Sequence, residues 1–348
     1  MLAVFLLLLL AVIASAQAVV PLGLPELPAA SRTISPGRVA LGKSLFSDRR
    51  LSADGTISCA SCHRPGHNLT DGHALAVGVG GQVGTRNAPS LYNVAFATSL
   101  FWDGRSTDLE SQAVLPLLNA REHGLASERA ALEILDNDRR YRKEFARVFS
   151  QPHVSIDAVA AALAAYERTL LAGDSPFDRY FYGGDPQAMS AAAIRGLSFF
   201  RGRAGCATCH TIGKTYALLT DQEFHSSPAR LPESVNSALV ELTGRVVQVQ
   251  EPNALNSMVV GDSDIASLGR YVVTRNPKDI GLFKTPSLRN VATTGPYLHD
   301  GSVKSLQEVV ELELYSRGDA MRSPIVATVE ERADLVEFLT ALSSPRTN

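Results

Sequence analysis

The chain has 348 residues, of which 45% are hydrophobic and 20% are charged, and its formal net charge is −2. Its 33 basic and 35 acidic residues form no basic stripe and no charged block, which excludes nucleic acid as the expected partner and a charged tail as an interaction arm. At roughly 150 residues per domain, the length indicates two domains.

Residues 1–16 predict an export signal, because an apolar run ends in the A-x-A-like site Ala14-Ser15-Ala16. The run is shorter than the roughly 20 apolar residues of an ordinary membrane span. No basic residue precedes it, so an uncleaved anchor remains the alternative. No later stretch is apolar enough to cross a bilayer. We therefore expect a bacterial periplasmic protein with no membrane attachment after the signal is cleaved.

All four cysteines fall in two C-x-x-C-H motifs, the attachment pattern of a c-type haem. The motifs are Cys59-Ala-Ser-Cys62-His63 and Cys206-Ala-Thr-Cys209-His210. Two thiols at this spacing form thioethers with the vinyl groups of one porphyrin, and the adjacent histidine ligates the iron. Two covalently bound haems are expected, with His63 and His210 as proximal ligands. A redox dithiol and two halves of one zinc centre are the rival interpretations.

An internal repeat relates the two halves of the chain. Residues 88–113 align without a gap on residues 285–310, and similar segments, 42–46 and 196–200, precede the two haem motifs. We expect a mainly α fold of two cytochrome c-like haem domains related by a pseudo-two-fold repeat. The domains are predicted at 17–180 and at 181–348, with one haem motif in each. Within the second, 226–267 is an inserted segment whose pattern is weak.

Apolar periodicity predicts helices at residues 154–171, 188–200 and 329–342. A helix is also expected after each Asp-Gly turn, at 109–118 and 306–315. A short strand at 270–274 is a minor candidate.

The helix after each turn is the expected wall of the haem pocket on the side away from the histidine. The first wall offers Gln112, Pro116 and, one turn beyond, Glu122. A carboxylate there can move a proton between the oxygens of bound peroxide, and such general acid–base help contributes typically 10² to 10⁴ in rate. The second wall ends in Tyr315, whose phenolate stabilises oxidised iron, and Met321 is a rival ligand.

The chain resembles the bacterial di-haem cytochrome c peroxidases, most closely their MauG-like branch, over about residues 36–342. Besides the two haem motifs, the resemblance lies in four segments. These are Thr85-Arg-Asn-Ala-Pro-Ser-Leu-Tyr-Asn93, Phe101-Trp-Asp-Gly-Arg105, Phe283-Lys-Thr-Pro-Ser-Leu-Arg-Asn290 and Pro296-Tyr-Leu-His-Asp-Gly301.

The resemblance implies roles for further residues. Trp102 would lie between the haems and relay electrons, and Gln112, Pro116 and Glu122 have the spacing of the family's peroxide pocket. A calcium ion would bind to Asn87, Thr294 and Pro296, since hard cations prefer oxygen ligands.

The sequence departs from typical reductively activated peroxidases at the loop after the first haem motif. There a histidine caps the first haem, whereas Val79 stands at that position here. The first haem should therefore be five-coordinate at rest. His67 and His73 are nearby alternatives, but we interpret them as surface or haem-propionate residues.

A second departure concerns the ligand of the second haem. The family's methionine or tyrosine comes fourteen residues after the histidine of His-Asp-Gly, which here is Glu313. Two residues turn a helix by about 200°, so Tyr315 can reach the iron only through a bulge or small insertion. We favour Tyr315 for its ligand chemistry, with Met321 and Glu313 as alternatives.

The resemblance implies a peroxidase that uses hydrogen peroxide to form a bis-Fe(IV) state and oxidises a residue, most plausibly tryptophan, on a periplasmic partner protein. We lean towards the MbnH-like option, in which a copper-binding partner is modified. The alternatives are a peroxide-scavenging cytochrome c peroxidase and a non-enzymatic di-haem electron carrier. Residues 226–267 are interpreted as part of a docking surface for the protein substrate, with an inert loop as the alternative.

Overall fold

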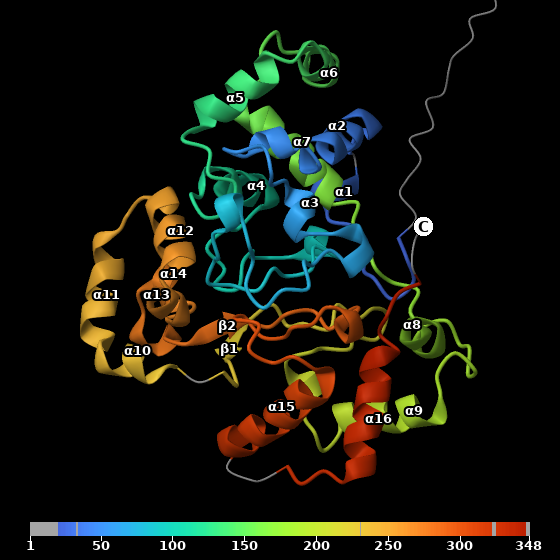
Figure 1. Cartoon of the computed structure of the whole chain (residues 1–348). Helices are drawn as coiled ribbons and strands as arrows, with labels where there is room; N and C mark the ends of the chain where they lie inside the picture. Colours follow the sequence, from blue (N-terminus) through green and yellow to red (C-terminus); the bar gives the residue numbers. More distant parts are fainter. Residues whose placement is uncertain (1–19, 33, 230, 322–324, 346–348) are drawn as a thin grey trace, which may run out of the picture.

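A computed structural model describes residues 20–32, 34–229, 231–321 and 325–345, without the side chains of residues 317–321 (Figure 1). The predicted export signal at residues 1–16 lies outside the described residues. None of the helices in the described part is long and apolar enough to cross a membrane.

The described residues are mainly helical, which confirms the predicted fold class. The α-helices are α1 (Ala29–Arg32), α2 (Pro36–Phe46), α3 (Cys59–Cys62), α4 (Leu109–Leu118), α5 (Glu128–Asp136), α6 (Arg139–Phe149), α7 (Ile156–Glu167), α8 (Pro176–Phe181), α9 (Ala191–Arg201), α10 (Glu233–Ser237), α11 (Leu239–Gln248), α12 (Pro252–Gly261), α13 (Ser263–Ser267), α14 (Tyr271–Thr274), α15 (Leu306–Met321) and α16 (Val329–Thr340). Two strands, β1 (Phe224–Ser226) and β2 (Leu282–Lys284), pair antiparallel, with His225 opposite Phe283.

Seven short 3₁₀ helices complete the described elements. They are η1 (Arg49–Leu51), η2 (Pro65–His67), η3 (Val79–Gly81), η4 (Val94–Phe96), η5 (Cys206–Thr208), η6 (Pro277–Asp279) and η7 (Val291–Thr293).

The same helix pair is built once around each haem motif. In the first half of the chain α2 packs on α7, and in the second half α9 packs on α16; Figure 1 shows the two groups one above the other. A glycine permits each close crossing. A Cβ at Gly42 would lie 1.9 Å from the carbonyl oxygen of Ala162, and one at Gly196 would lie 1.9 Å from that of Asp334. The helix repeat in space thus follows the sequence repeat.

The core is divided in the same way. One buried hydrophobic cluster contains Phe46, Leu117 and Leu163, and another contains Phe200, Leu314 and Phe338. The domain boundary at residue 180 stays a prediction, because side chains of both halves also share one cavity, as described below.

The predicted helices are present with shifted ends: α7, α9 and α16 correspond to the predictions at 154–171, 188–200 and 329–342, and α4 spans residues 109–118 as predicted. The candidate strand at 270–274 was wrong, since Tyr271–Thr274 forms α14. Buried Tyr271 and Val272 there pack in a helical cluster, so this β-branched stretch follows its tertiary surroundings rather than its strand propensity.

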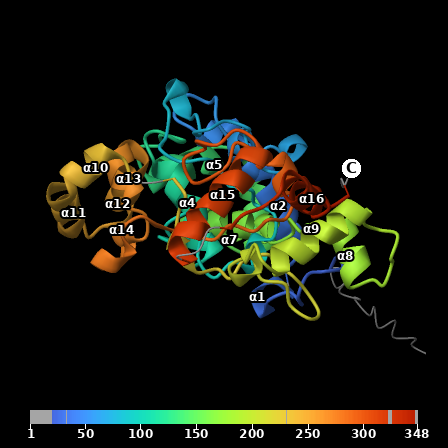
Figure 2. The same cartoon turned by 90° about the horizontal axis from the view of Figure 1, so that it is seen from below.

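The inserted segment is a small helical unit with its own hydrophobic cluster. Helices α10–α13 and α14 share buried Val235, Leu242, Val259 and Leu268, and Figures 1 and 2 place them together to one side of both halves. The segment also packs on the first half, where α12 contacts α4 and the hydroxyl of Thr85 donates to the carbonyl of Val259 at 2.7 Å. It therefore bridges the two halves, although it belongs in sequence to the second.

Candidate functional site: two cavities at the C-x-x-C-H motifs

The first haem motif faces a cavity of about 330 Å³. Cys59 and Cys62, at the two ends of the one-turn helix α3, line it together with His63. The Nδ1 atom of His63 lies 3.0 Å from the carbonyl oxygen of Leu69, so this nitrogen donates and Nε2 is left to bind a metal. Burial lowers the pKa of His63, which keeps the imidazole in the neutral form that a metal ligand requires.

The second haem motif lines a separate cavity of about 180 Å³. Cys206, Cys209 and His210 contribute to its wall, and Nδ1 of His210 lies 2.9 Å from the carbonyl oxygen of Leu219. The aromatic neighbour is repeated too: the ring of Phe46 is 6.5 Å from that of His63, and the ring of Phe200 is 6.5 Å from that of His210. Each motif thus presents its histidine in the same way.

A pair of serines supports the two histidine loops, which the sequence analysis missed. Ser90 donates to the carbonyl of Asn68 at 2.7 Å, and Ser287 donates to that of Leu218 at 2.8 Å. Each accepting residue directly precedes the leucine whose carbonyl holds the histidine. The repeated Pro-Ser-Leu-x-Asn motif contained the signal, because the same serine recurs at both sites.

The cavities fit haem rather than one shared zinc centre. Each joins two cysteines, a histidine whose Nδ1 is held by a backbone carbonyl, and a largely apolar lining, which is the donor set for a thioether-linked porphyrin with an axial imidazole. The two motifs line different cavities, and among the described residues no cluster of three or more metal-binding side chains combines them. Cys59, Cys62 and His63 would hold the first haem, and Cys206, Cys209 and His210 the second.

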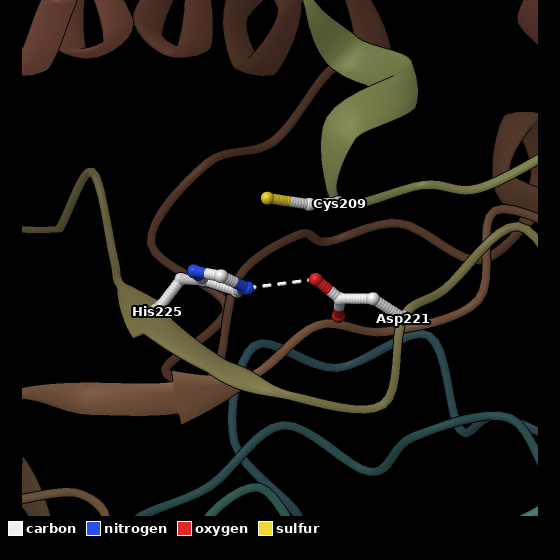
Figure 3. A group of neighbouring side chains, drawn as sticks. All are labelled: Cys209, Asp221 and His225. Atoms are coloured by element: carbon white, nitrogen blue, oxygen red, sulfur yellow. Dashed lines mark hydrogen bonds and ion pairs between the residues drawn. The ribbon is translucent and has the colours of Figure 1, made fainter.

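One cluster with metal-ligand character does exist beside the second motif (Figure 3). Ligand atoms of Cys209, Asp221 and His225 lie within 4.8 Å of one another, and Nε2 of His225 is 2.8 Å from Asp221 Oδ2. Burial raises the pKa of Asp221, but hydrogen bonds from the Glu223 backbone and from His225 outweigh it, so the pKa is lowered overall. Because Cys209 belongs to the haem motif, we assign the cluster to the edge of the second haem site.

The wall of the first cavity formed by α4 and the turn after it, here called the α4 wall, carries the predicted peroxide-pocket residues. Gln112, Pro116 and Glu122 all line the cavity. Burial raises the pKa of Glu122, whereas the nearby charge of Arg105 lowers it, and Oε2 of Glu122 is buried without a hydrogen-bond partner. A buried carboxylate with an uncommitted oxygen can accept and return a proton. Arg105, which the sequence analysis did not single out, lines the same cavity.

The loop after the first motif supports Glu122 from behind. The Val79 N–H donates to the Glu122 carbonyl at 2.8 Å, and a Cβ at Gly78 would lie 2.0 Å from the carbonyl oxygen of Arg121. The close approach explains the glycine. His67 and His73 are exposed and do not line the cavity. Their assignment to the surface is consistent with this placement.

Trp102 contributes to the walls of both cavities. Its indole N–H donates to the carbonyl of Asn87 at 3.0 Å, and its own carbonyl accepts from the Lys284 N–H at 2.8 Å. The tryptophan is thus fixed to both halves of the chain. Lys284 also lines both cavities, and burial lowers the pKa of its ammonium group to about 8; no sequence pattern pointed to it.

The wall of the second cavity formed by α15, here called the α15 wall, differs from the favoured prediction. Glu313 lines the cavity together with Val309 and Val310, whereas Tyr315 is 65% exposed and is not part of the wall. Helix α15 runs without interruption from Leu306 to Met321, so no bulge turns Tyr315 inward. The expectation that Tyr315 faces the second haem is therefore not met in this arrangement. The side chain of Met321 lies outside the described residues.

The three predicted calcium ligands contribute to the wall of one cavity. Asn87, Thr294 and Pro296 all line the first cavity near Trp102, and the Asn87 side-chain NH₂ donates to the carbonyls of His73 and Ala74 at 2.9 and 3.3 Å. A calcium ion at this place stays a prediction.

Comparison with known proteins agrees with this geometry. Residues 36–186 match the family described as di-haem cytochrome c peroxidase. The chain is 39% identical over 336 residues to the cytochrome-c peroxidase IdrP1 of Denitromonas iodatirespirans, covering 93% of this chain and 86% of that protein. It is 35% identical over 319 residues to the methylamine utilization protein MauG of Methylorubrum extorquens, covering 89% and 79%.

A solved structure shows the same fold. A MauG-like protein associated with microbial copper homeostasis superposes with a TM-score of 0.72 at 30% sequence identity, covering 94% of this chain and 93% of the other.

Proposed function

Because the chain belongs to the family of di-haem cytochrome c peroxidases, which includes MauG, we propose that it uses hydrogen peroxide to oxidise a tryptophan on a periplasmic partner protein. The family makes it a peroxidase with two haem cofactors. The protein substrate, the periplasmic location and a calcium ion between the halves are part of the proposal. The partner that we favour is a copper-binding protein, since a similar structure is a MauG-like protein associated with copper homeostasis.

The observation that carries the proposal is the loop at Val79. Reductively activated relatives have a histidine there that closes the first haem, whereas this loop offers a buried valine and uses its backbone to hold Glu122. The first site is therefore built to meet peroxide without prior reduction.

Glu122 and Arg105 act in the first cavity, and Trp102 connects the two cavities. Bound haem supplies the redox centre at which peroxide is split. Glu122 accepts the proton of the incoming peroxide on its uncommitted oxygen and returns it to the departing one, while Arg105 keeps positive charge beside it. Trp102, which lines both cavities, carries electrons between them. Each peroxide takes two electrons and two protons from the partner's tryptophan and leaves as two waters.

The experiment is peroxide addition to the fully oxidised, haem-loaded protein mixed with a tryptophan-containing periplasmic copper-binding protein. Mass spectrometry should locate an oxidised tryptophan on the partner, and only when peroxide and both proteins are present. An unmodified partner, with peroxide consumed just as fast in its absence, would remove the proposal.

A peroxide-scavenging peroxidase is the second candidate, favoured by the 39% identity to a relative named cytochrome-c peroxidase. In that case a reduced small cytochrome should be oxidised rapidly by peroxide and this protein, without covalent change to any protein. The electron-carrier alternative falls away, because the relatives are peroxidases.

A further inference from the structure

Arg105 is a buried cation of the first cavity. Asp103 and Phe101 of its own loop hold it, and a third contact comes from the inserted unit. Its side chain is 5% exposed and its Nη1 donates to both carboxylate oxygens of Asp103, at 3.0 and 2.9 Å. Its guanidinium stacks 3.6 Å from the ring centre of Phe101. These contacts come from its own loop. They leave the Nε end of the guanidinium to be fixed from elsewhere.

The remaining contact comes from the inserted helical unit. Nε of Arg105 donates to Oδ1 of Asn256 at 3.1 Å, and Asn256 lies on α12 with only 2% of its surface exposed. The other end of the same amide, Nδ2, donates to the carbonyl of Leu115 in α4 at 3.4 Å. One side chain of the insert thus joins the cavity's cation to the helix that carries Gln112 and Pro116.

The α4 carbonyl that Asn256 meets lies in the last turn of the helix, which ends at Leu118. At the end of α4 the N–H of Asn119 donates to the carbonyl of Pro116 rather than to that of Leu115. The last carbonyls of a helix lack intrahelical partners and need a donor from outside. Asn256 supplies a donor, so an apolar residue at this position would remove the partner of both Arg105 Nε and the Leu115 carbonyl.

The insert is held in place independently of this amide. Thr85 donates to the carbonyl of Val259, Arg86 donates to that of Ala266, and the unit has its own buried cluster. Helix α12 therefore presents Asn256 from a fixed support. A support of this kind gives a side chain the rigidity that a positioning role needs.

We propose that the inserted unit α10–α13 is a positioning element of the first haem cavity, and that Asn256 is its positioning residue, fixing the Arg105 guanidinium and the last turn of α4 relative to Glu122. The inference rests on the proposed function in one respect, the role of Glu122 in handling the proton of peroxide. The inference gives a positioning role to the side of α12 that faces the first cavity. The sequence had suggested only a docking surface for this segment.

Other charged or titratable groups surround Glu122, and the test must keep them constant. Arg121 is exposed and donates to the carbonyl of Val83 at 3.0 Å, and His123 is buried with Nδ1 2.6 Å from the carbonyl oxygen of Leu51. The sulfur of Cys62, a thioether in the haem-loaded protein, and the carboxyl of Glu167 line the same cavity. None of these four groups contacts Asn256 through a hydrogen bond among the described residues, so substitutions of Asn256 leave them in place.

Two substitutions separate the two ends of the amide. Asn256→Leu keeps the volume and removes both hydrogen bonds. Asn256→Asp keeps an acceptor for Arg105 and removes the donor to Leu115. Arg245→Ala is the matched control, because it breaks an ion pair of the same unit, to Asp262 at 2.8 Å, outside the cavity wall.

The test measures cyanide affinity of the oxidised, haem-loaded protein by optical titration, together with kcat and KM for peroxide with a dye as electron donor. In Asn256→Leu we expect cyanide affinity to fall about tenfold, which is the effect of losing one hydrogen bond to a charged group. We also expect a larger change in kcat than in KM. Asn256→Asp should restore most of the affinity, and Arg245→Ala should match the unmodified protein.

Unchanged cyanide affinity in Asn256→Leu would overturn the proposal, as would equal losses in all three variants. If Asn256→Leu does not load haem, Asn256→Ser carries the same expectation, because its hydroxyl is too short to span both partners. The cyanide titration needs no partner protein, so its result is independent of whether the protein oxidises a tryptophan on a partner.

Discussion

On the histidine side, the first and second cavities share their contacts almost atom for atom. Nδ1 of the histidine lies 3.0 Å from the carbonyl of Leu69 in one and 2.9 Å from that of Leu219 in the other. The supporting serine hydrogen bonds are 2.7 and 2.8 Å long. The repeat has kept the part of each half that attaches a haem and orients its axial imidazole.

The other walls have diverged at corresponding positions. When the repeats are aligned, Gln112 corresponds to Val309 and Pro116 to Glu313, and all four line their own cavity. Proline offers iron no donor atom, whereas a carboxylate does. The comparison teaches that the two sites differ in the α4 and α15 side chains that line them, while the contacts of their histidines are the same.

The largest effect is expected from Glu122→Gln, which removes the proton acceptor of the first cavity. The rate of reaction with peroxide should fall by about 10² to 10⁴, with haem content unchanged. Stopped-flow absorption measures the rate. An unaltered rate would mean that the two walls do not differ in acid–base function.

The same residue sets an expected pH dependence. Burial raises the pKa of Glu122 above its ordinary 4.5. Only the ionised form accepts a proton, so the rate should decline as the pH falls through that raised value, earlier than for an exposed glutamate. The acid limb should be absent in Glu122→Gln.

Trp102→Phe tests whether the cavities communicate, and a smaller effect is expected. The substitution removes the hydrogen bond to the Asn87 carbonyl and the larger π-system between the sites. Peroxide should still react at the first haem, but the spectral response of the second should lag behind it in stopped-flow traces. Trp102→Tyr, whose phenol is oxidised more easily than the ring of phenylalanine, should show a smaller lag. Simultaneous responses in all variants would contradict the relay.

Glu313→Gln and Tyr315→Phe test which of these two α15 residues contacts the second haem. Given that Glu313 lines the cavity and Tyr315 is exposed, only Glu313→Gln should alter the low-temperature electron paramagnetic resonance spectrum of the second haem. The opposite result would show that α15 changes its register when haem binds.

The smallest effects are expected from Ser90→Ala and Ser287→Ala, which sharpen the comparison on the side where the cavities agree. Each loses one hydrogen bond to a loop carbonyl, at a cost of about 1 kcal/mol. Thermal unfolding should show a similar decrease for both, and each should shift the midpoint potential of its own haem only. Unequal responses would contradict the equivalence of the two histidine sides.

Sequence predicted what local motifs and the repeat encode. The haem motifs, the mainly helical fold, α4 and the gathering of Gln112, Pro116 and Glu122 in one cavity all follow from residues close together in the chain. These features depend on short spacings and helix periodicity, which a single sequence displays directly.

The remaining features depend on contacts between distant segments. Asn256 and Arg105 are 151 residues apart and come from different halves of the chain, and no pattern marks an asparagine for a buried amide role. The insert looked irregular because α10 and α13 are each a single short helix of 5 residues. The choice between Glu313 and Tyr315 depends on helical phase, which ligand chemistry alone does not determine.

The shared lining of the first cavity also has a practical consequence for anyone dissecting this chain. Thr294, Pro296 and Tyr297 of the second half complete that cavity, and the N–H of Ala217 donates to the carbonyl of Gly23 near the start of the described chain. A fragment ending at residue 180 would therefore lack part of the wall of the first cavity. Split-protein designs and single-haem truncations should be planned around reassociation of the pieces, not around independent modules.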